Sequence, residues 1–285
     1  MARRGGSMTQ PDHRGGSARR PVALVAGAAG DIGRAMCRRF HRDGYALACL
    51  DVRSEQLVLL SHELEIAPPD IYCAAIDLTE PEAVRSIVDQ VAFQMGGIDV
   101  LINTAGGNKT LTIADATPAT WLADIHLNLN AAFYLAAAVL PHMQRQRKGN
   151  VVNIGSVNGL GIYGDPGYSA AKAGLIQFTK QMAVEYGHYG IRANVICPGT
   201  VKTQAWERML AERPEFIEEA ARLYPLQGVA TPADIAGIAA FLASPDARII
   251  TGSVLVADGG LTAGIPGVAQ FFTSGKPFLA PACPT

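Results

Sequence analysis

Short apolar stretches alternate with longer segments of helical periodicity along most of the chain. Several of the short stretches are apolar throughout, which is typical of parallel strands that are covered on both faces. About seven strands are predicted, over residues 22–26, 46–51, 71–76, 100–103, 150–154, 192–197 and 253–257. Their alternation with helices predicts an α/β fold, a doubly wound parallel sheet with helices on both faces.

The segments between these strands predict helices over residues 31–43, 81–95, 118–146, 168–189 and 232–244. Residues 203–224 also have helical spacing, but they mix charged and apolar residues and follow no strand directly. We therefore expect a helical cap inserted at about 200–227. No Pro- or Ser-rich linker divides the chain, so a single domain is expected over 21–262. Residues 1–20 lack an apolar run and predict a disordered tail.

Composition narrows the functional classes. The chain of 285 residues has 24 Lys and Arg against 25 Asp and Glu, a balance that argues against a nucleic-acid or anionic-membrane binder. The longest apolar stretch, residues 131–140, is too short to cross a bilayer. Five cysteines, an odd number without CxxC spacing, predict a reducing compartment and a cytoplasmic location. No metal site is predicted.

A glycine-rich loop joins the first strand to the first helix, with the sequence Gly27-Ala28-Ala29-Gly30-Asp31-Ile32-Gly33. Small residues here let the backbone approach a pyrophosphate at a helix N-terminus, so the loop predicts a dinucleotide site. Asp51 ends the next strand, where a carboxylate accepts hydrogen bonds from ribose hydroxyls and repels a 2′-phosphate. This position favours NAD over NADP, although Arg53 offers a cation for that phosphate.

Tyr168 and Lys172 are four residues apart and share one face of a predicted helix. A nearby ammonium and a positive nicotinamide favour tyrosinate, which lowers the pKa of the phenol and suits it to acid–base catalysis. Ser156 follows the fifth strand, where its hydroxyl is expected to hydrogen-bond a substrate oxygen.

Taken together, these motifs resemble the short-chain dehydrogenase/reductase family, in its shorter branch. The resemblance covers residues 21–262, and further motifs carry it in the same order: Asp77-Leu78, Asn103-Thr104-Ala105-Gly106, Asn128-Leu129, Pro198-Gly199 with Thr203, and Asp258-Gly259-Gly260. It implies a Rossmann-type sheet and a reaction on a CH–OH group of a small-molecule substrate.

The resemblance also assigns expected roles. Tyr168 is the acid–base group, Lys172 lowers its pKa and holds the nicotinamide ribose, Ser156 orients the substrate oxygen, and Asn128 anchors a water that leads to Lys172. Trp206 in the cap is expected beside the substrate. The residues expected to bind the cofactor NAD are Gly27, Gly30, Asp31, Ile32, Gly33, Asp51, Asp77, Leu78, Asn103, Ala105, Gly106, Tyr168, Lys172, Pro198, Gly199, Val201 and Thr203.

Assembly follows from the same resemblance. A homotetramer is expected through the long helices predicted over 118–146 and 168–189. Residues 263–285 form a C-terminal tail, and Phe271 and Phe272 within it are expected either to pack on a neighbouring subunit or to form a loose end.

One departure from the family pattern stands out. Asp31 replaces the middle glycine of G-x-x-x-G-x-G, while Gly30 supplies a G-x-x-G-x-x-G spacing that resembles the extended branch of epimerases and dehydratases. The short stretch after Tyr168 opposes that branch. We expect Asp31 to be the N-cap of the first helix, with its charge pointing away from the phosphates.

The predicted function is an NAD(H)-dependent oxidoreductase that interconverts a secondary alcohol, such as a sugar or polyol, with its ketone or lactone. The alternative is a keto- or oxo-acyl reductase working in the reducing direction. An epimerase or dehydratase is a further alternative, which the short stretch after Tyr168 opposes. A non-catalytic dinucleotide-binding protein is another, which the Tyr–Lys pair opposes.

Overall fold

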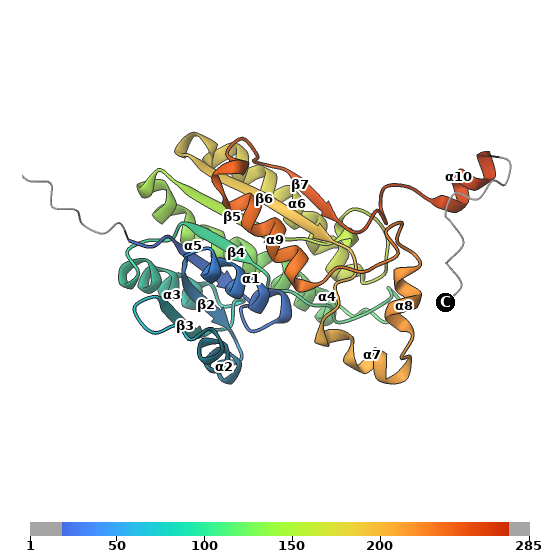
Figure 1. Ribbon diagram of the computed structural model, residues 1–285, viewed down its shortest axis with the longest axis horizontal. Helices are drawn as coiled ribbons and strands as arrows, with labels where there is room; N and C mark the ends of the chain where they lie inside the picture. Colours follow the sequence, from blue (N-terminus) through green and yellow to red (C-terminus); the bar gives the residue numbers. More distant parts are fainter. Residues whose placement is uncertain (1–18, 274–285) are drawn as a thin grey trace, which may run out of the picture.

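The computed structural model describes residues 19–273. Seven parallel strands form one sheet in the order β3-β2-β1-β4-β5-β6-β7, so the predicted α/β sheet is confirmed (Figure 1). Every strand boundary lies within one residue of the prediction. The strands are β1 Val22–Ala26, β2 Ala46–Asp51, β3 Ile71–Ala75, β4 Val100–Asn103, β5 Gly149–Ile154, β6 Ile191–Pro198 and β7 Val254–Ala257.

Helices cover both faces of the sheet, and each face has its own apolar core. On one face lie α1 Asp31–Arg42, α2 Ser54–Leu64 and α9 Pro232–Ala243. On the other lie α3 Pro81–Gln94, α5 Ala131–Gln146 and α6 Pro166–Tyr186. The central strands are buried on both faces, which explains why their sequences are apolar throughout.

Two helices differ from the prediction. Helix α2 was not predicted, because only Leu57 and Leu60 of this helix are buried and they form no regular apolar stripe. Helix α6 begins at Pro166, two residues before the predicted start, since proline is favoured at the first helical position. It ends at Tyr186 and continues as a 3₁₀ turn over Gly187–Tyr189.

The helix predicted over 118–146 contains a π-helical turn. It consists of α4 Pro118–Ile125, the π-helical turn His126–Asn130 and α5. Among the described residues this helical segment, Pro118–Gln146, is the one long and apolar enough to cross a membrane. Its apolar side chains, such as Leu135 and Val139, are buried against the sheet, so packing accounts for its hydropathy.

The predicted cap is made of a 3₁₀ turn, Gln204–Trp206, followed by α7 Glu207–Glu212 and α8 Phe216–Ala221. Figure 1 shows α7 and α8 extending beyond the end of the sheet. After β7 the chain forms α10 Pro266–Phe272, which stands away from the sheet in the same view. Residues 1–18 and 274–285 of the two predicted tails lie outside the described residues.

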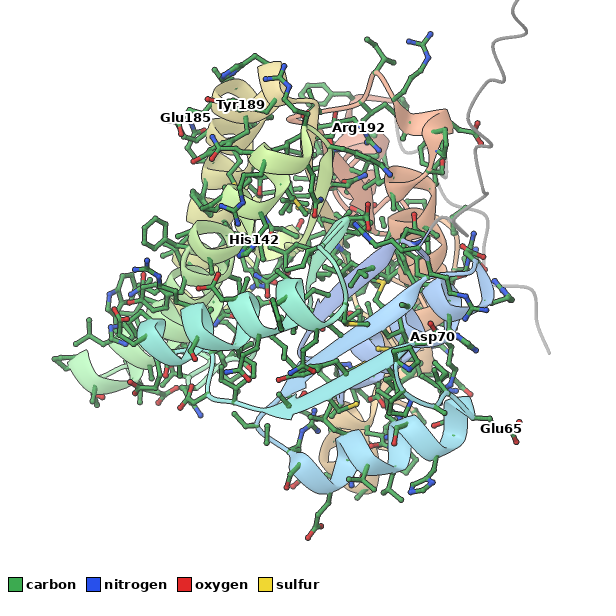
Figure 2. All side chains as sticks on the ribbon, turned by 90° about the vertical axis from the view of Figure 1, so that its left-hand side faces the viewer. Glu65, Asp70, His142, Glu185, Tyr189 and Arg192 are labelled. Carbon is green, nitrogen blue, oxygen red and sulfur yellow. The ribbon has the colours of Figure 1, made fainter. Side chains whose placement is uncertain are left out.

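Ion pairs lie at one end of the sheet, and the predicted nucleotide-binding residues lie at the other. At the end where the strands begin, ion pairs join Arg19 to Asp99 and Arg20 to Asp70, and Arg192 donates to the carbonyl oxygen of Leu242. Figure 2 looks onto this end, where the labelled Asp70 and Arg192 lie. The glycine loop, Asp51 and Asn103 lie at the opposite, carboxyl end, where open parallel sheets bind their ligands.

Gly33 allows α1 to pack against the glycine loop. A Cβ at this position would lie 2.1 Å from the carbonyl oxygen of Gly27 and 2.8 Å from the Cα of Ala28, and neither backbone atom can rotate away. We predict that Gly33→Ala lowers the free energy of unfolding by about 2 kcal/mol or more. Denaturant unfolding followed by circular dichroism measures it.

Gly187→Ala is the matched control, since Gly187 has helical backbone angles and no atom within 4 Å of an added Cβ. This variant should be neutral or stabilised by up to about 1 kcal/mol. Equal unfolding midpoints for the two variants would show that the close approach at Gly33 is unimportant.

Candidate active site

The glycine loop is held against the ends of β2 and β4, the strands on either side of β1. The backbone N–H groups of Gly27 and Ala28 both donate to the carbonyl oxygen of Leu50 in β2. A Cβ at Gly27, whose φ is +79°, would lie 2.8 Å from both the amide nitrogen of Ala105 and Oγ1 of Thr104. Glycine is therefore required where the loop meets the segment that follows β4.

A pocket of about 230 Å³ opens beside this loop at the carboxyl ends of the strands. Most of the residues that line it belong to the predicted dinucleotide site, and the remainder come from the same strand ends and from the π-helical turn. The lining residues are Gly27, Gly30, Asp51, Val52, Arg53, Ile76, Asp77, Leu78, Thr104, Ala105, Gly106 and Leu127.

Asp51 is buried and fully hydrogen-bonded. Its carboxylate accepts from the amide of Ala29 at 3.0 Å, and from the amide and guanidinium of Arg53 at 3.0 to 3.3 Å. Burial would raise the pKa of Asp51, but the bonds from Arg53 and Ala29 outweigh it and hold this pKa below its usual value. Asp51 thus binds the glycine loop as a carboxylate, with Arg53 lying over it.

Three more predicted residues lie at the strand ends: Asp77 and Leu78 line the pocket, and Asn103 ends β4. Asp77 accepts from the amide and the hydroxyl of Thr79, and Leu78 is buried behind it. Asn103, at the end of β4, is buried, and its Oδ1 has no hydrogen-bond partner. An unpaired buried amide oxygen is costly, which is typical of a group that awaits a ligand.

Lys172 lies at the centre of the site, one helical turn after Tyr168. This residue is 3% exposed, and its ammonium donates to the carbonyl oxygen of Ile154 at 2.8 Å. The ammonium lies 5.4 Å from the centre of the Tyr168 ring. Because burial penalises the charged form, the pKa of Lys172 falls to about 8.

Tyr168 and Ser156 are also in contact. Burial raises the pKa of Tyr168 above its ordinary value, and a hydrogen bond with the Ser156 side chain opposes this increase. The lowered pKa expected from the sequence is therefore not produced by the protein's own groups. Ser156 also accepts a hydrogen bond from the amide of Asn158 at 3.1 Å, which fixes its hydroxyl at the end of β5.

Asn128 lies in the π-helical turn and is buried. Its Nδ2 donates to the carbonyl oxygens of Gly107 and Asp124, while its Oδ1 accepts from the amide of Gly107 at 3.1 Å. Helical irregularities of this kind often occur at functional sites. The side chain thus holds the segment after β4 in place.

Gly106 connects the pocket to this cluster. It lines the pocket, and a Cβ added to it would lie 2.8 Å from Oδ1 of Asn128 and 3.3 Å from Nζ of Lys172. The structure therefore brings the glycine loop, Asp51, Asn128, Ser156, Tyr168 and Lys172 together at one end of the sheet.

Other predicted residues do not line this pocket. Ile32 lies in α1 and packs against the core, and Val201 forms a bridge with Ala230 at the base of the cap. Trp206 donates to the carbonyl oxygen of Val201 and packs on Phe216, 5.1 Å between ring centres, so its described contacts lie within the cap. Pro198, Gly199 and Thr203 also belong to the segment that leads into the cap.

The expected N-cap role of Asp31 is wrong. The N-cap of α1 is Gly30, which makes no side-chain bond there, and Asp31 is the first residue of the helix. Its Oδ2 instead accepts a hydrogen bond from the backbone amide of Gln204, 2.7 Å away at the start of the cap. The sequence does not reveal this contact, because its partners lie 173 residues apart.

Sequence reasoning also missed Asn158. Its Nδ2 donates to the carbonyl oxygen of Gly164 and to the hydroxyl of Ser169, so it ties the loop after Ser156 to the first turns of α6. The Ser-x-Asn spacing is the signal that marks such a turn. In residues 19–273 no group of three His, Cys, Asp or Glu side chains is placed to hold a metal ion.

Comparison with known proteins identifies the chain. Residues 27–262 match a family described as "Enoyl-(Acyl carrier protein) reductase". An uncharacterized oxidoreductase of Schizosaccharomyces pombe is 38% identical, over 87% of this chain and 93% of that protein. The chain belongs to the short-chain dehydrogenase/reductase family. It is an oxidoreductase of a family that binds a nicotinamide dinucleotide and acts on small molecules.

Further members of the family agree with this assignment. The 3-oxoacyl-[acyl-carrier-protein] reductase FabG of Thermotoga maritima is 35% identical, over 84% of this chain and 97% of that protein. The crystal structure of a short-chain dehydrogenase/reductase oxidoreductase from Burkholderia thailandensis superposes with a TM-score of 0.85. It is 40% identical and covers 92% of this chain and 100% of its own. ElxO, solved with NADP bound, is 27% identical with a TM-score of 0.81, over 86% of this chain and 100% of its own.

The buried ammonium of Lys172 leads to a prediction about stability. Its pKa in the folded protein is about 8, below its ordinary value of 10.5, so between these values the unfolded chain binds the additional proton. The destabilisation is therefore fully present below pH 8 and is lost as the pH rises to 10.5. It amounts to on the order of 3 kcal/mol, since one pKa unit corresponds to about 1.4 kcal/mol.

Lys172→Met should therefore raise the free energy of unfolding at pH 7 by roughly 2 kcal/mol, after subtracting about 1 kcal/mol for the lost bond to Ile154. The gain should shrink as the pH approaches 10.5. Chemical denaturation of both proteins between pH 7 and 10.5 measures it, and a gain that is constant with pH would contradict this account of Lys172.

Proposed function

We propose that the protein is an NAD(H)-dependent oxidoreductase that interconverts a secondary alcohol and its ketone. The observation that carries the proposal is the convergence of Ser156, Tyr168, Lys172 and Asn128 beside a pocket formed by the glycine loop. A purely dinucleotide-binding protein has no need for a buried Lys beside a half-buried Tyr.

The residues around the pocket fit a dinucleotide. Gly27 and Gly30 line the pocket without side chains, which lets the backbone approach a pyrophosphate at the N-terminus of α1. Asp51 lines the pocket and would accept the ribose hydroxyls in place of the Arg53 guanidinium, and the unpaired Oδ1 of Asn103 can accept a further donor. When bound, the nicotinamide supplies the hydride acceptor and a positive charge that favours tyrosinate.

The chain's own residues would move the proton. Tyr168 takes the proton of the substrate hydroxyl, while Ser156 holds the substrate oxygen through the hydroxyl that now contacts Tyr168. Lys172, with a pKa of about 8, exchanges protons readily near neutral pH and lies against the same ring. Asn128 fixes the backbone beside Lys172, where a water can complete the path to solvent.

The second candidate is a keto- or oxo-acyl reductase, which the same site serves in the reverse direction. A specific observation favours it: Leu111, Ile113 and Ile162 are exposed on loops beside the first turn of α6. These loops are joined where the amide of Asp165 donates to the carbonyl oxygen of Leu111. Exposed apolar residues on these loops suit an acyl chain better than the sugar or polyol predicted from the cap's polar residues.

Assembly as a homotetramer and a cytoplasmic location remain proposals. Phe133 on α5 and Val184 on α6 are exposed apolar residues, which supports contacts between copies through these helices. Phe271 and Phe272 on α10 are about 80% exposed, which supports a tail that packs on another subunit.

The catalytic proposal predicts that Tyr168→Phe abolishes turnover, because the variant keeps the ring but loses the proton-transferring hydroxyl. The expected loss is at least about 10²-fold. Nicotinamide absorbance with secondary alcohols, polyols and β-hydroxyacyl thioesters measures turnover. Dinucleotide affinity, measured by calorimetry, should be nearly unchanged, and retained turnover would overturn the proposal.

The cofactor proposal predicts that NAD binds more than tenfold tighter than NADP, since Asp51 repels a 2′-phosphate. Arg53→Ala should bind NAD at least as tightly as the parent protein, because it releases Asp51 from its partner. Arg38→Ala, which breaks the pair with Glu63 outside the pocket, is the control. Weaker NADP binding by Arg53→Ala, with NAD unaffected, would show instead that Arg53 holds the 2′-phosphate.

A further inference from the structure

Asp31 makes an unusual contact for a residue of the glycine loop. It stands at the middle glycine of the family's G-x-x-x-G-x-G pattern, and its carboxylate accepts a hydrogen bond from the amide of Gln204 at 2.7 Å. A hydrogen bond between a carboxylate and a backbone N–H is charge-assisted and stronger than a neutral one. The contact therefore joins the first βα unit to the first residue of the cap.

Gln204 begins the 3₁₀ turn that leads into α7, and its N–H is one that the turn itself leaves without a partner. The preceding residue, Thr203, has extended backbone angles but makes no side-chain cap bond. Asp31 therefore acts as a helix-capping group, although not for its own helix α1. It accepts the N–H at the start of the 3₁₀ turn with which the substrate cap begins. The capping comes from a distant part of the chain.

The other hydrogen bonds described for the cap do not hold it to the glycine loop. Val201 bridges to Ala230, and the hydroxyl of Tyr224 contacts Thr200. The amide of Leu226 donates to the carbonyl oxygen of Gly259. These bonds close the base of the cap, where the chain enters and leaves it.

The charge of Asp31 also acts on a residue of the nucleotide pocket. Its negative charge acts on the guanidinium of Arg53, which lines that pocket. A carboxylate at this edge opposes a pyrophosphate at the N-terminus of α1. Replacing glycine by Asp is therefore expected to weaken dinucleotide binding while it strengthens the attachment of the cap.

We propose that Asp31 is a positioning residue that fastens the first turn of the substrate cap to the glycine loop, at the expense of dinucleotide affinity. The part that concerns substrate rests on the proposed function. The attachment itself is independent of that function, because it is a hydrogen bond between two segments of the chain.

Three variants separate the two effects. Asp31→Asn keeps an oxygen acceptor and removes the charge, whereas Asp31→Ala removes both. Gln204→Pro deletes the donor. Proline is tolerated at the first position of a helical turn, and the extended Thr203, with φ −130° and ψ 166°, suits a residue that precedes proline. Asp43→Ala, at the other end of α1, is a control for loss of a negative charge.

The measurement is amide hydrogen exchange over residues 205–212 in the protein without added ligand. Asp31→Ala and Gln204→Pro should each raise exchange there by roughly tenfold, and the double variant should add little, because both remove one bond. Asp31→Asn and Asp43→Ala should stay within a few-fold of the parent. Unchanged exchange in Asp31→Ala, or fully additive effects in the double variant, would overturn the proposal.

Dinucleotide binding gives an independent readout. Calorimetry should show tighter NAD binding for both Asp31→Asn and Asp31→Ala, and no change for Asp43→Ala. If a substrate is turned over, Asp31→Ala should raise KM more than it changes kcat, and Asp31→Asn should restore KM. Absence of turnover in the parent protein would refute the proposed function but leave the exchange result to decide the attachment.

Discussion

The site is organised around one buried ammonium group, that of Lys172. Removing a cation from water is costly unless hydrogen bonds compensate for it. The end of β5 supplies such a bond through the carbonyl oxygen of Ile154, and the backbone of Gly106 approaches the ammonium from the end of β4. Asn128 and Tyr168 complete its surroundings. Strand ends and helices must therefore keep their positions for this charge to be accommodated.

The burial of Lys172 makes the fold less stable than an apolar side chain would at this position. In return, it gives the site a group that exchanges protons near neutral pH. Burial brings the pKa of Lys172 close to neutral pH, where a group can both accept and release a proton. It raises the pKa of Tyr168, so the tyrosine remains protonated until a ligand charge or a substrate changes its environment. The protein thus holds its acid–base pair in an environment that penalises both charged forms.

Much of the fold and of the site could be predicted from the sequence, because both depend on local patterns. Strands buried on both faces have continuous apolar sequences, so their boundaries were visible to within one residue. Parallel strands end at the same edge of a sheet, so Asp51, Asn103 and Ser156 could be expected to converge. Long-range contacts were not predictable: the bond between Asp31 and Gln204 joins residues without any shared pattern. The π-helical turn around Asn128 was likewise not predicted, because its residues include no Gly or Pro that would mark a change in the helix.

The central claim is that Lys172 carries an ammonium whose pKa is lowered by burial at the heart of the site. Nuclear magnetic resonance of the protein with ¹³C at lysine Cε tests it directly, with Lys172→Met to assign the signal. Titration should show one lysine with a pKa near 8. A Lys172 signal that titrates near the ordinary 10.5 would contradict the account.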